Sequence, residues 1–329
     1  MTIASAPAAT AAAADASVRW HPGGPFNLLQ SLGILMRGNG DPSFANRPDG
    51  LWMAFTTPDG PATLRLTAVS GPDCFVDAQA WGPGAESAIA GVPRLLGQDD
   101  DWSGFDEPAF QAGLPRLVIE ARRRNPGLRL PATGRVVDSL VPTILEQKVT
   151  TIEARRGYRY LMYRYGSPAP GAGRPFGSSP PSGLLVAPTA AQWLGIPSWE
   201  WHKAGVGPQR SATVMRALRS ASGLERLALL DAAEAGAKLQ SIPGIGIWTA
   251  AEVLQRTHGC PDSIAVGDYH LASYVGYALT GKKTDDAGML ALMEPWRGHR
   301  QRVVRMLGLS GFRKPAFGPR MTIQDHRGH

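Results

Sequence analysis

The fold of this chain is constrained most by the run from Leu239 to Tyr269, which reads LQSIPGIGIWTAAEVLQRTHGCPDSIAVGDY. A helical pattern over 232–240 leads into Pro243-Gly244-Ile245-Gly246, and a second helical pattern begins directly after it. Proline presets its own φ and glycine tolerates positive φ, so this tetrapeptide predicts a tight turn between two helices. Such a turn presents the first backbone N–H groups of the second helix, which form a ready site for a phosphate.

A wider motif surrounds this turn. It reads Leu-x-x-Ile-Pro-Gly-Ile-Gly-x-x-Thr-Ala from Leu239, and Val266-Gly267-Asp268-Tyr269 follows about twenty residues later. The motif resembles the helix-hairpin-helix-Gly-Pro-Asp superfamily of DNA glycosylases. Within that superfamily the chain looks like the alkylation-repair branch, the 3-methyladenine DNA glycosylase II family. The resemblance implies a base excision repair enzyme that acts on damaged double-stranded DNA and removes an alkylated base by hydrolysis of its N-glycosidic bond.

The resemblance also implies a role for individual residues. Asp268 would stabilise the positive charge that develops on the sugar, and Trp248 and Tyr269 would stack on the extruded base. Plainer interpretations stay open, because Asp268 could be only the N-cap of the next helix and Trp248 only a core residue. The residues expected to contact DNA are Gln240, Ile242, Gly244, Ile245, Gly246 and Thr249 of the hairpin and Lys148 of an earlier motif.

Two features narrow the activity that the resemblance implies. Trp248 stands where relatives that also cut the DNA backbone carry a lysine, so the hairpin offers no amine for a Schiff base. The chain has two cysteines, Cys74 and Cys260, which is too few for the four-cysteine cluster motif of some superfamily members. We therefore expect an enzyme that removes a base and stops. The only ion expected is Na⁺ or K⁺ on backbone oxygens of Gln240, Ile242 and Ile245.

A second family match covers Ser139 to Ala154, which reads SLVPTILEQKVTTIEA. In relatives, the residue after the Glu-Gln pair is the wedge that enters the duplex where the target base has left. That residue is Lys148 here, in place of the leucine of well-known members. Its methylene stem can fill the gap while its ammonium reaches a phosphate. Glu146 of the same motif is expected to support the structure.

The base pocket departs from the family at one further position. In relatives, an aromatic residue of the C-terminal helix helps to form this pocket, and the corresponding position here is Arg305. We therefore expect a pocket that is more open or more polar on that side.

The distribution of charge predicts two regions. Residues 1–113 hold 5 Arg, no Lys and 12 acidic residues, whereas residues 114–329 hold 29 basic and 15 acidic residues. The basic region contains the hairpin, which favours a polyanionic partner. With 329 residues, about two domains are expected. They are an α/β domain over 18–98 and a helical glycosylase domain over 99–312, between a disordered tail at 1–17 and a basic tail at 313–329. The fold class is mainly α with a small N-terminal α/β domain, and α+β overall.

Hydrophobic periodicity predicts the individual elements. Strands are expected at 51–57, 62–69 and 73–81. Helices are expected at 26–37, 108–124, 138–149, 150–165, 208–220, 269–279, 285–293 and 295–309. The Pro/Gly/Ser run at 166–183 is expected to form no regular element. Trp193, Trp199 and Trp201 are expected to be buried between helices rather than to stack on bases.

The remaining expectations concern compartment and rival functions. No apolar run approaches the length of a bilayer span, and the Ala-rich start does not resemble a signal peptide. A cytoplasmic protein is therefore expected, nucleoid-associated in a bacterium. We also expect a monomer. One rival is a glycosylase of the same fold for deaminated or etheno bases. The other is a catalytically silent helix-hairpin-helix DNA-binding protein, whose hallmark would be the loss of Asp268.

Overall fold

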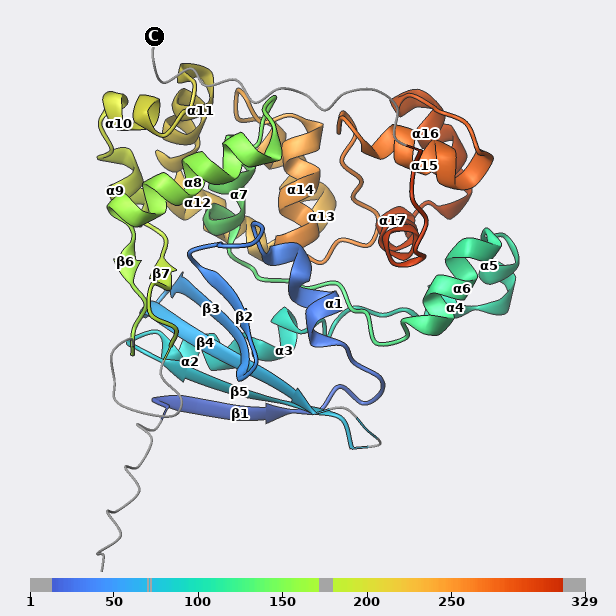
Figure 1. Cartoon of the computed structure of the whole chain (residues 1–329), viewed down its shortest axis with the longest axis horizontal. Helices are drawn as coiled ribbons and strands as arrows, with labels where there is room; N and C mark the ends of the chain where they lie inside the picture. The colour runs from blue at the N-terminus through green and yellow to red at the C-terminus, as the bar shows by residue number, and fades with distance from the viewer. Residues whose placement is uncertain (1–13, 70, 72, 172–179, 316–329) are drawn as a thin grey trace, which may run out of the picture.

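The computed structural model describes residues 14–69, 71, 73–171 and 180–315. Its N-terminal part is a five-stranded antiparallel sheet with the strand order β1-β5-β4-β3-β2, which lies below the helices in Figure 1. The strands are β1 (Ala16–Trp20), β2 (Phe44–Arg47), β3 (Gly50–Thr57), β4 (Gly60–Val69) and β5 (Phe75–Trp81). The three predicted strands are confirmed as β3, β4 and β5, and β1 and β2 extend the sheet at its two edges.

One face of the sheet packs on three short helices. Alternate residues of β3 and β4 point to this face, where Leu51 pairs with Leu66 and Met53 with Leu64. The helices that cover it are α1 (Leu28–Leu32), α2 (Ala85–Ala90) and α3 (Val92–Leu95). A 3₁₀ turn, η1 (Gly33–Leu35), continues α1, so the expected helix at 26–37 is shorter than predicted.

The other face of the sheet carries a pair of tryptophans. Trp52 stacks on Trp81 with ring centroids 5.4 Å apart. They pack with the short strands β6 (Ser167–Pro168) and β7 (Leu185–Val186), which pair with each other. The prediction that 166–183 forms no regular element is therefore wrong for β6, because pairing with β7 and packing on the tryptophans order it. Residues 172–179 of that run lie outside the described residues.

The helices form two groups, each with its own core, on the two sides of Figure 1. The first contains α7 (Val136–Leu145), α8 (Thr151–Tyr165), α9 (Ala190–Leu194), α10 (Ser198–Lys203), α11 (Pro208–Leu218), α12 (Ala221–Arg226), η2 (Leu227–Leu229), α13 (Ala232–Gln240) and α14 (Ile247–Thr257). The second contains α4 (Ser103–Asp106), α5 (Pro108–Ala112), α6 (Arg116–Arg124), α15 (Leu271–Thr280), α16 (Asp286–Met293), η3 (Glu294–Trp296) and α17 (Arg300–Leu309). The expected class, mainly α with a small α/β part, is confirmed.

Three more predicted helices differ from the observed ones. The segment 108–124 forms α5 and α6, because Pro115 disfavours a helical conformation at Leu114. The segment 295–309 forms η3 and then α17, with Gly298 at a φ of 92° between them. The segment 138–149 stops at Leu145, and α8 starts with a capping box between Thr150 and Glu153. The motif Thr-x-x-Glu is a sequence signal for that start.

The three tryptophans expected in the core divide into two sets. Trp193 and Trp201 are buried with ring centroids 5.8 Å apart, as predicted. Trp199 is 62% exposed, so the prediction is wrong for it. It lies on the first turn of α10, next to Ser198, where the helix turns its outer face to solvent.

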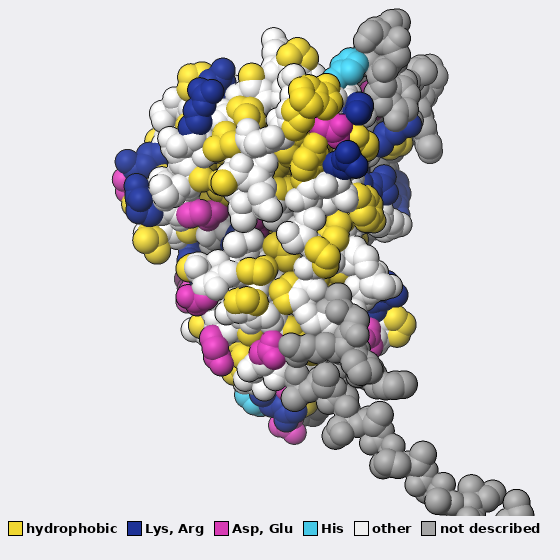
Figure 2. All heavy atoms as spheres, turned by 90° about the vertical axis from the view of Figure 1, so that its left-hand side faces the viewer, with side chains coloured by type: hydrophobic (Ala, Val, Ile, Leu, Met, Phe, Trp, Pro, Cys, Tyr) yellow, Lys and Arg dark blue, Asp and Glu magenta, His cyan; other side chains and the backbone are white. Residues whose placement is uncertain are grey.

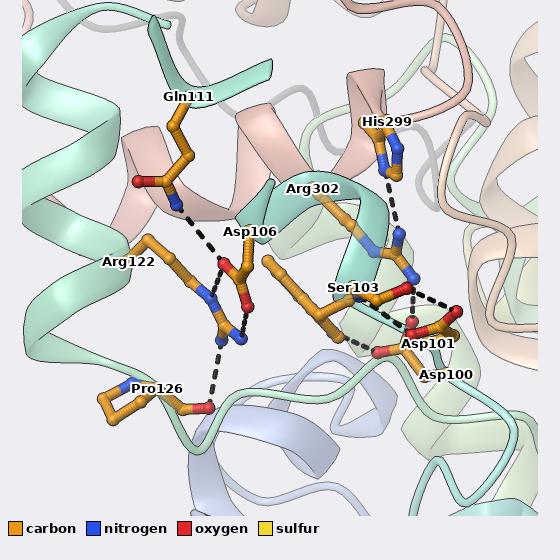
Figure 3. A network of polar contacts seen from close by, with 10 residues as sticks. Asp100, Asp101, Ser103, Asp106, Gln111, Arg122, Pro126, His299 and Arg302 are labelled. Atoms are coloured by element: carbon orange, nitrogen blue, oxygen red, sulfur yellow. Dashed lines mark hydrogen bonds and ion pairs between the residues drawn. The ribbon is translucent and has the colours of Figure 1, made fainter. Parts of the chain in front are cut away.

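The two ends of the helical segment are joined by a buried ion pair (Figure 3). Asp100 and Arg302 have side chains that are only 3% and 5% exposed. The Asp100 Oδ1 atom accepts a hydrogen bond from Arg302 Nη2, and its Oδ2 accepts one from Trp102 Nε1 and one from Leu130 N, each at 2.6 Å. This network fixes the start of α4 against α17, about two hundred residues later in the chain.

The surface reflects the predicted division of charge. On the face in Figure 2, Lys and Arg side chains lie mainly over the helical upper half, and Asp and Glu are more frequent in the lower half, over the sheet. Within the described residues, no helix combines the length and apolar character that a membrane span requires.

Candidate active site

The predicted hairpin is residues 241–246, between α13 and α14. The two glycines of this hairpin have different structural roles. Gly244 has a φ of +96°, and a Cβ on it would lie 2.5 Å from Thr213 Oγ1, so a side chain there would disturb the fold. Gly246 has a φ of −97° as the N-cap of α14, and a Cβ on it would meet no atom within 4 Å. Gly246 thus leaves the N-terminus of α14 open to a ligand.

The carbonyl oxygens of the hairpin are partly used by neighbouring side chains. Arg216 Nη1 donates to Pro243 O at 2.5 Å, and Ile245 N donates to Ile242 O at 3.0 Å. A carbonyl oxygen has two lone pairs, so Ile242 O retains one for the cation that the sequence predicts here. That cation stays a prediction. Within the described part of the chain, no group of three or more His, Cys, Asp or Glu side chains is placed to hold a metal ion.

Two of the predicted DNA contacts of the hairpin, Ile245 and Thr249, can come only from the backbone. The side chains of Ile245 and Thr249 are buried, and Ile245 packs in the core of the first helical group. Gln240, Gly244 and Gly246 are exposed, and Ile242 is half-buried. The exposed part of the hairpin is therefore mostly peptide groups and glycine, which a phosphate can approach closely.

The turn that carries Lys148 is joined to this hairpin. Gln147 Nε2 donates to Gly244 O at 3.0 Å and to Thr249 Oγ1 at 2.9 Å. Lys148 is exposed, and its φ of 54° is the only positive φ among the described residues other than glycine. A left-handed conformation costs energy for a residue with a Cβ and is concentrated at functional positions. Glu146 instead forms an ion pair with Arg37 at 2.8 Å, which is the structural role predicted for it.

Asp268 has the N-cap geometry that the plainer interpretation requires. Its Oδ1 atom accepts hydrogen bonds from His270 N and Leu271 N, both at 2.8 Å, at the start of α15. Asp268 also lines a cavity of about 490 Å³ between α14, α15, α17 and the end of η1. The residue therefore both caps α15 through Oδ1 and borders this cavity. The other polar residues that line this cavity are Glu252, Gln255, Arg256, His270, Tyr274, Gln301, Arg305 and Lys314.

The sequence of this chain was compared with family models and with curated proteins. No family model matches the chain. The probable bifunctional transcriptional activator/DNA repair enzyme AlkA of Mycobacterium tuberculosis is 27% identical over 197 residues, which is 60% of this chain and 36% of that protein. The chain thus spans about a third of the length of this curated relative.

Solved structures give a wider match. The 3-methyladenine DNA glycosylase from Archaeoglobus fulgidus superposes with a TM-score of 0.68 at 15% identity, over 90% of this chain and 99% of that one. The 8-oxoguanine glycosylase/lyase from Clostridium acetobutylicum superposes with a TM-score of 0.63 at 10% identity, over 90% of this chain and 96% of that one. The chain has the helix-hairpin-helix DNA glycosylase fold. The resemblance predicted from the hairpin and Asp268 is confirmed at this level.

In this glycosylase fold, the two predicted stacking residues lie beside the cavity and not in its wall. Trp248 is half-buried on the first turn of α14, outside the four hydrophobic clusters. One turn further, Glu252 does line the cavity. Tyr269 is 77% exposed and follows Asp268 directly. Their stacking role stays a prediction. Arg305 lines the cavity together with Asp268. That this is the polar side of the base pocket stays a prediction.

The sequence interpretation missed an ion pair in this wall. Glu252 Oε2 and Arg256 Nη1 are 2.7 Å apart on α14, and Arg256 Nε also donates to Ile34 O at 3.2 Å. Burial, and next the nearby Arg37, lower the pKa of Arg256. The i, i+4 spacing from Trp248 to Glu252 and on to Arg256 marks one face of the helix, and this spacing was the signal that could have revealed the pair.

Arg305 is the second half-buried cation that lines this cavity. Its Nη2 atom donates to Gln30 O at 2.5 Å. Its Nη1 atom is buried and has no hydrogen-bond partner in the part of the chain that the structure describes. Burial, and next the nearby Arg256, lower the pKa of this guanidinium to about 10, so it remains charged at neutral pH. The wall of the cavity thus includes a fixed positive charge.

Proposed function

We propose that the protein is a monofunctional DNA glycosylase that hydrolyses the N-glycosidic bond of a damaged base in double-stranded DNA. The observation that carries this proposal is the position of Asp268, which lines the cavity between α14, α15 and α17 in a glycosylase fold. A glycosidic carbon cannot be reached inside a duplex, so the nucleotide must be extruded into such a cavity. A silent DNA-binding protein would need Asp268 only as the N-cap of α15.

The proposed chemistry rests on the charge of Asp268. As the glycosidic bond breaks, positive charge develops on the sugar, and a fixed carboxylate stabilises it. The two backbone N–H groups on Oδ1 hold the carboxylate in one orientation, so little reorganisation is required in the transition state. The same carboxylate orients or deprotonates the attacking water. Trp248 supplies no amine, so no covalent intermediate forms at the hairpin.

DNA is the proposed partner, and the hairpin and Lys148 are the proposed contacts. The N-terminus of α14 attracts a phosphate through its free N–H groups and helix dipole. The C. acetobutylicum glycosylase, which shares this fold with a TM-score of 0.59 in its complex, was solved with double-stranded DNA. Lys148 projects from the turn that Gln147 ties to the hairpin, which suits a wedge in the duplex.

Two substrate classes are candidates. Alkylated bases of the 3-methyladenine type are one class, supported by the family resemblance of the motifs. Deaminated or etheno bases are the other, supported by the charged cavity wall at Arg305 and Arg256. The proposal is tested with duplexes that contain a methylated, a deaminated or an etheno base. Each duplex is incubated with the protein, treated with alkali to cleave abasic sites, and analysed on a gel. Cleavage of at least one of them is expected, and none on any of them would refute it.

Gly246→Asp separates DNA binding from folding. Aspartate is a good N-cap residue, and Gly246 has extended backbone at the N-cap with open space around it, so melting temperature should be unchanged or higher. The same carboxylate would occupy the free N–H groups and repel a phosphate, so affinity for duplex DNA should fall at least about tenfold. Filter binding measures this, with Gly246→Ala as the control for bulk alone. A Gly246→Asp protein that binds duplex as tightly as the parent would refute the phosphate contact.

Trp248→Ala tests the stacking role. Stacking on a base contributes roughly 1–3 kcal/mol, so excision should fall by about 5- to 150-fold. Melting temperature should change little, because Trp248 lies outside the hydrophobic clusters. Trp193→Ala is the contrasting control, since this buried ring should lose about 3–5 kcal/mol of stability. A large loss of stability with normal excision in Trp248→Ala would make Trp248 a core residue.

A further inference from the structure

Arg37 joins the N-terminal part of the chain to the end of α7. It lies in the segment between η1 and β2 and is only 8% exposed. Its guanidinium donates to Glu146 Oε2 at 2.8 Å and to Thr143 Oγ1 at 3.0 Å. Its backbone N–H donates to Asp41 Oδ2 at 2.7 Å, which orders the segment from which the side chain extends. Charge-assisted bonds of this kind have a defined geometry, so Arg37 fixes the position of Glu146.

The same segment contacts α8, on the other side of the turn between α7 and α8. Gly38 has a φ of 84°, and a Cβ on it would clash with the guanidinium of Arg155. Arg159 Nη1 donates to Asn39 O at 3.5 Å. Arg155 and Arg159 are one turn apart on α8. The segment after η1 therefore contacts both helices that flank the turn of Lys148.

Lys148 is held in its unusual conformation by its neighbours in this turn. Of the two residues before it, Glu146 is bonded to Arg37 and Gln147 to the hairpin. Lys148 itself is exposed and has a φ of 54°. A residue with a Cβ leaves such a conformation unless the surrounding structure imposes it. The bond between Arg37 and Glu146 helps to impose it, because it fixes the residue two positions before Lys148.

We propose that Arg37 is a positioning residue for the duplex wedge, and that it acts through Glu146 to hold Lys148 in the conformation that enters DNA where a base has left. This inference rests on the role of Lys148 in the proposed function. It assigns the N-terminal part of the chain a role in the recognition of damage. A wedge gains contacts at a vacant base position, and an intact duplex offers none. A preorganised Lys148 should therefore raise the affinity for damaged duplex selectively.

The test measures the affinity of the full chain for two duplexes by fluorescence anisotropy. One duplex is undamaged, and the other contains a tetrahydrofuran analogue of an abasic site, which the parent is expected to prefer. Arg37→Met should weaken binding to the abasic duplex about tenfold and change binding to the undamaged duplex less than about twofold. Lys148→Ala should do the same. The double variant should lose no more affinity than Lys148→Ala alone, because both substitutions act through one side chain.

Two further variants control for folding. Arg122 is also a mostly buried arginine with a carboxylate partner, Asp106, at 2.6 Å, but it lies in the second helical group. Arg122→Met should therefore leave the affinity for both duplexes unchanged. Glu146→Gln breaks the ion pair with Arg37 from its more exposed side and should reproduce the effect of Arg37→Met. It takes the place of Arg37→Met if that variant does not fold.

The outcomes separate this inference from the proposed function. An equal loss for both duplexes in Arg37→Met would make Arg37 only a structural link, and the inference would be wrong. Losses from Arg37→Met and Lys148→Ala that add in the double variant would also overturn it. So would a Lys148→Ala or Glu146→Gln protein that binds the abasic duplex as tightly as the parent. If the affinities change as expected but the parent releases no damaged base, the inference stands and the proposed function is wrong.

Discussion

Replacing Asp268 by asparagine is expected to lower single-turnover base release by about 10²- to 10³-fold, the usual cost of losing one preorganised electrostatic group. Asparagine retains the Oδ1 atom that accepts from His270 N and Leu271 N, and it caps helices about as well as aspartate. The melting temperature should therefore stay within about 2 °C of the parent value. Binding to a duplex with an abasic site should persist, because the hairpin is unchanged.

The chain offers a matched control for this variant. Asp285 is the N-cap of α16, and its Oδ1 accepts from Gly288 N at 2.8 Å, but it does not line the cavity. Asp285→Asn should therefore leave both stability and excision unchanged. If Asp268→Asn releases bases as fast as the parent, Asp268 is only an N-cap, and the catalytic assignment is wrong.

Asp100→Ala is expected to destabilise the protein by about 3–5 kcal/mol, because it leaves the buried guanidinium of Arg302 without its carboxylate. It also removes the acceptor of Trp102 Nε1 and Leu130 N. Urea unfolding at neutral pH measures the loss. The neighbouring Asp99 is exposed, so Asp99→Ala should change the free energy of unfolding by no more than about 0.5 kcal/mol. A loss below about 1 kcal/mol in Asp100→Ala would show that the network of Figure 3 contributes little.

The parts of this fold that the sequence predicted well are those with strong local signals. The helix at 232–240 and the turn at 243–246 were predicted at their observed positions, because Pro243 and the glycines mark the break between periodic segments. The strands β3 and β4 were found from the turn signal between them. Asp268 was identified from its motif and Arg305 from its position in the C-terminal helix, and both line one cavity.

The parts that were missed depend on contacts distant in sequence. The acidic run at 99–101 suggested only a connector, yet Asp100 is buried because Arg302 and Trp102 surround it. The apolar pattern up to Val149 predicted a longer α7, but α7 ends at Leu145, and Lys148 has a left-handed conformation in the turn before α8. The edge strands β1 and β2 are short and owe their order to pairing with β5 and β3. Such tertiary effects override local propensity.

The central claim, a glycosylase that removes a base and leaves the DNA strand intact, is tested most directly by one experiment. The protein in excess is incubated with its preferred damaged duplex, and free base and strand breaks are measured before and after alkali, with borohydride added in parallel. We predict release of free base, an intact strand until alkali is added, and no protein trapped covalently on the DNA. Strand cleavage without alkali together with a trapped complex would contradict this account, and would direct attention to Lys314 as an amine nucleophile in the cavity wall.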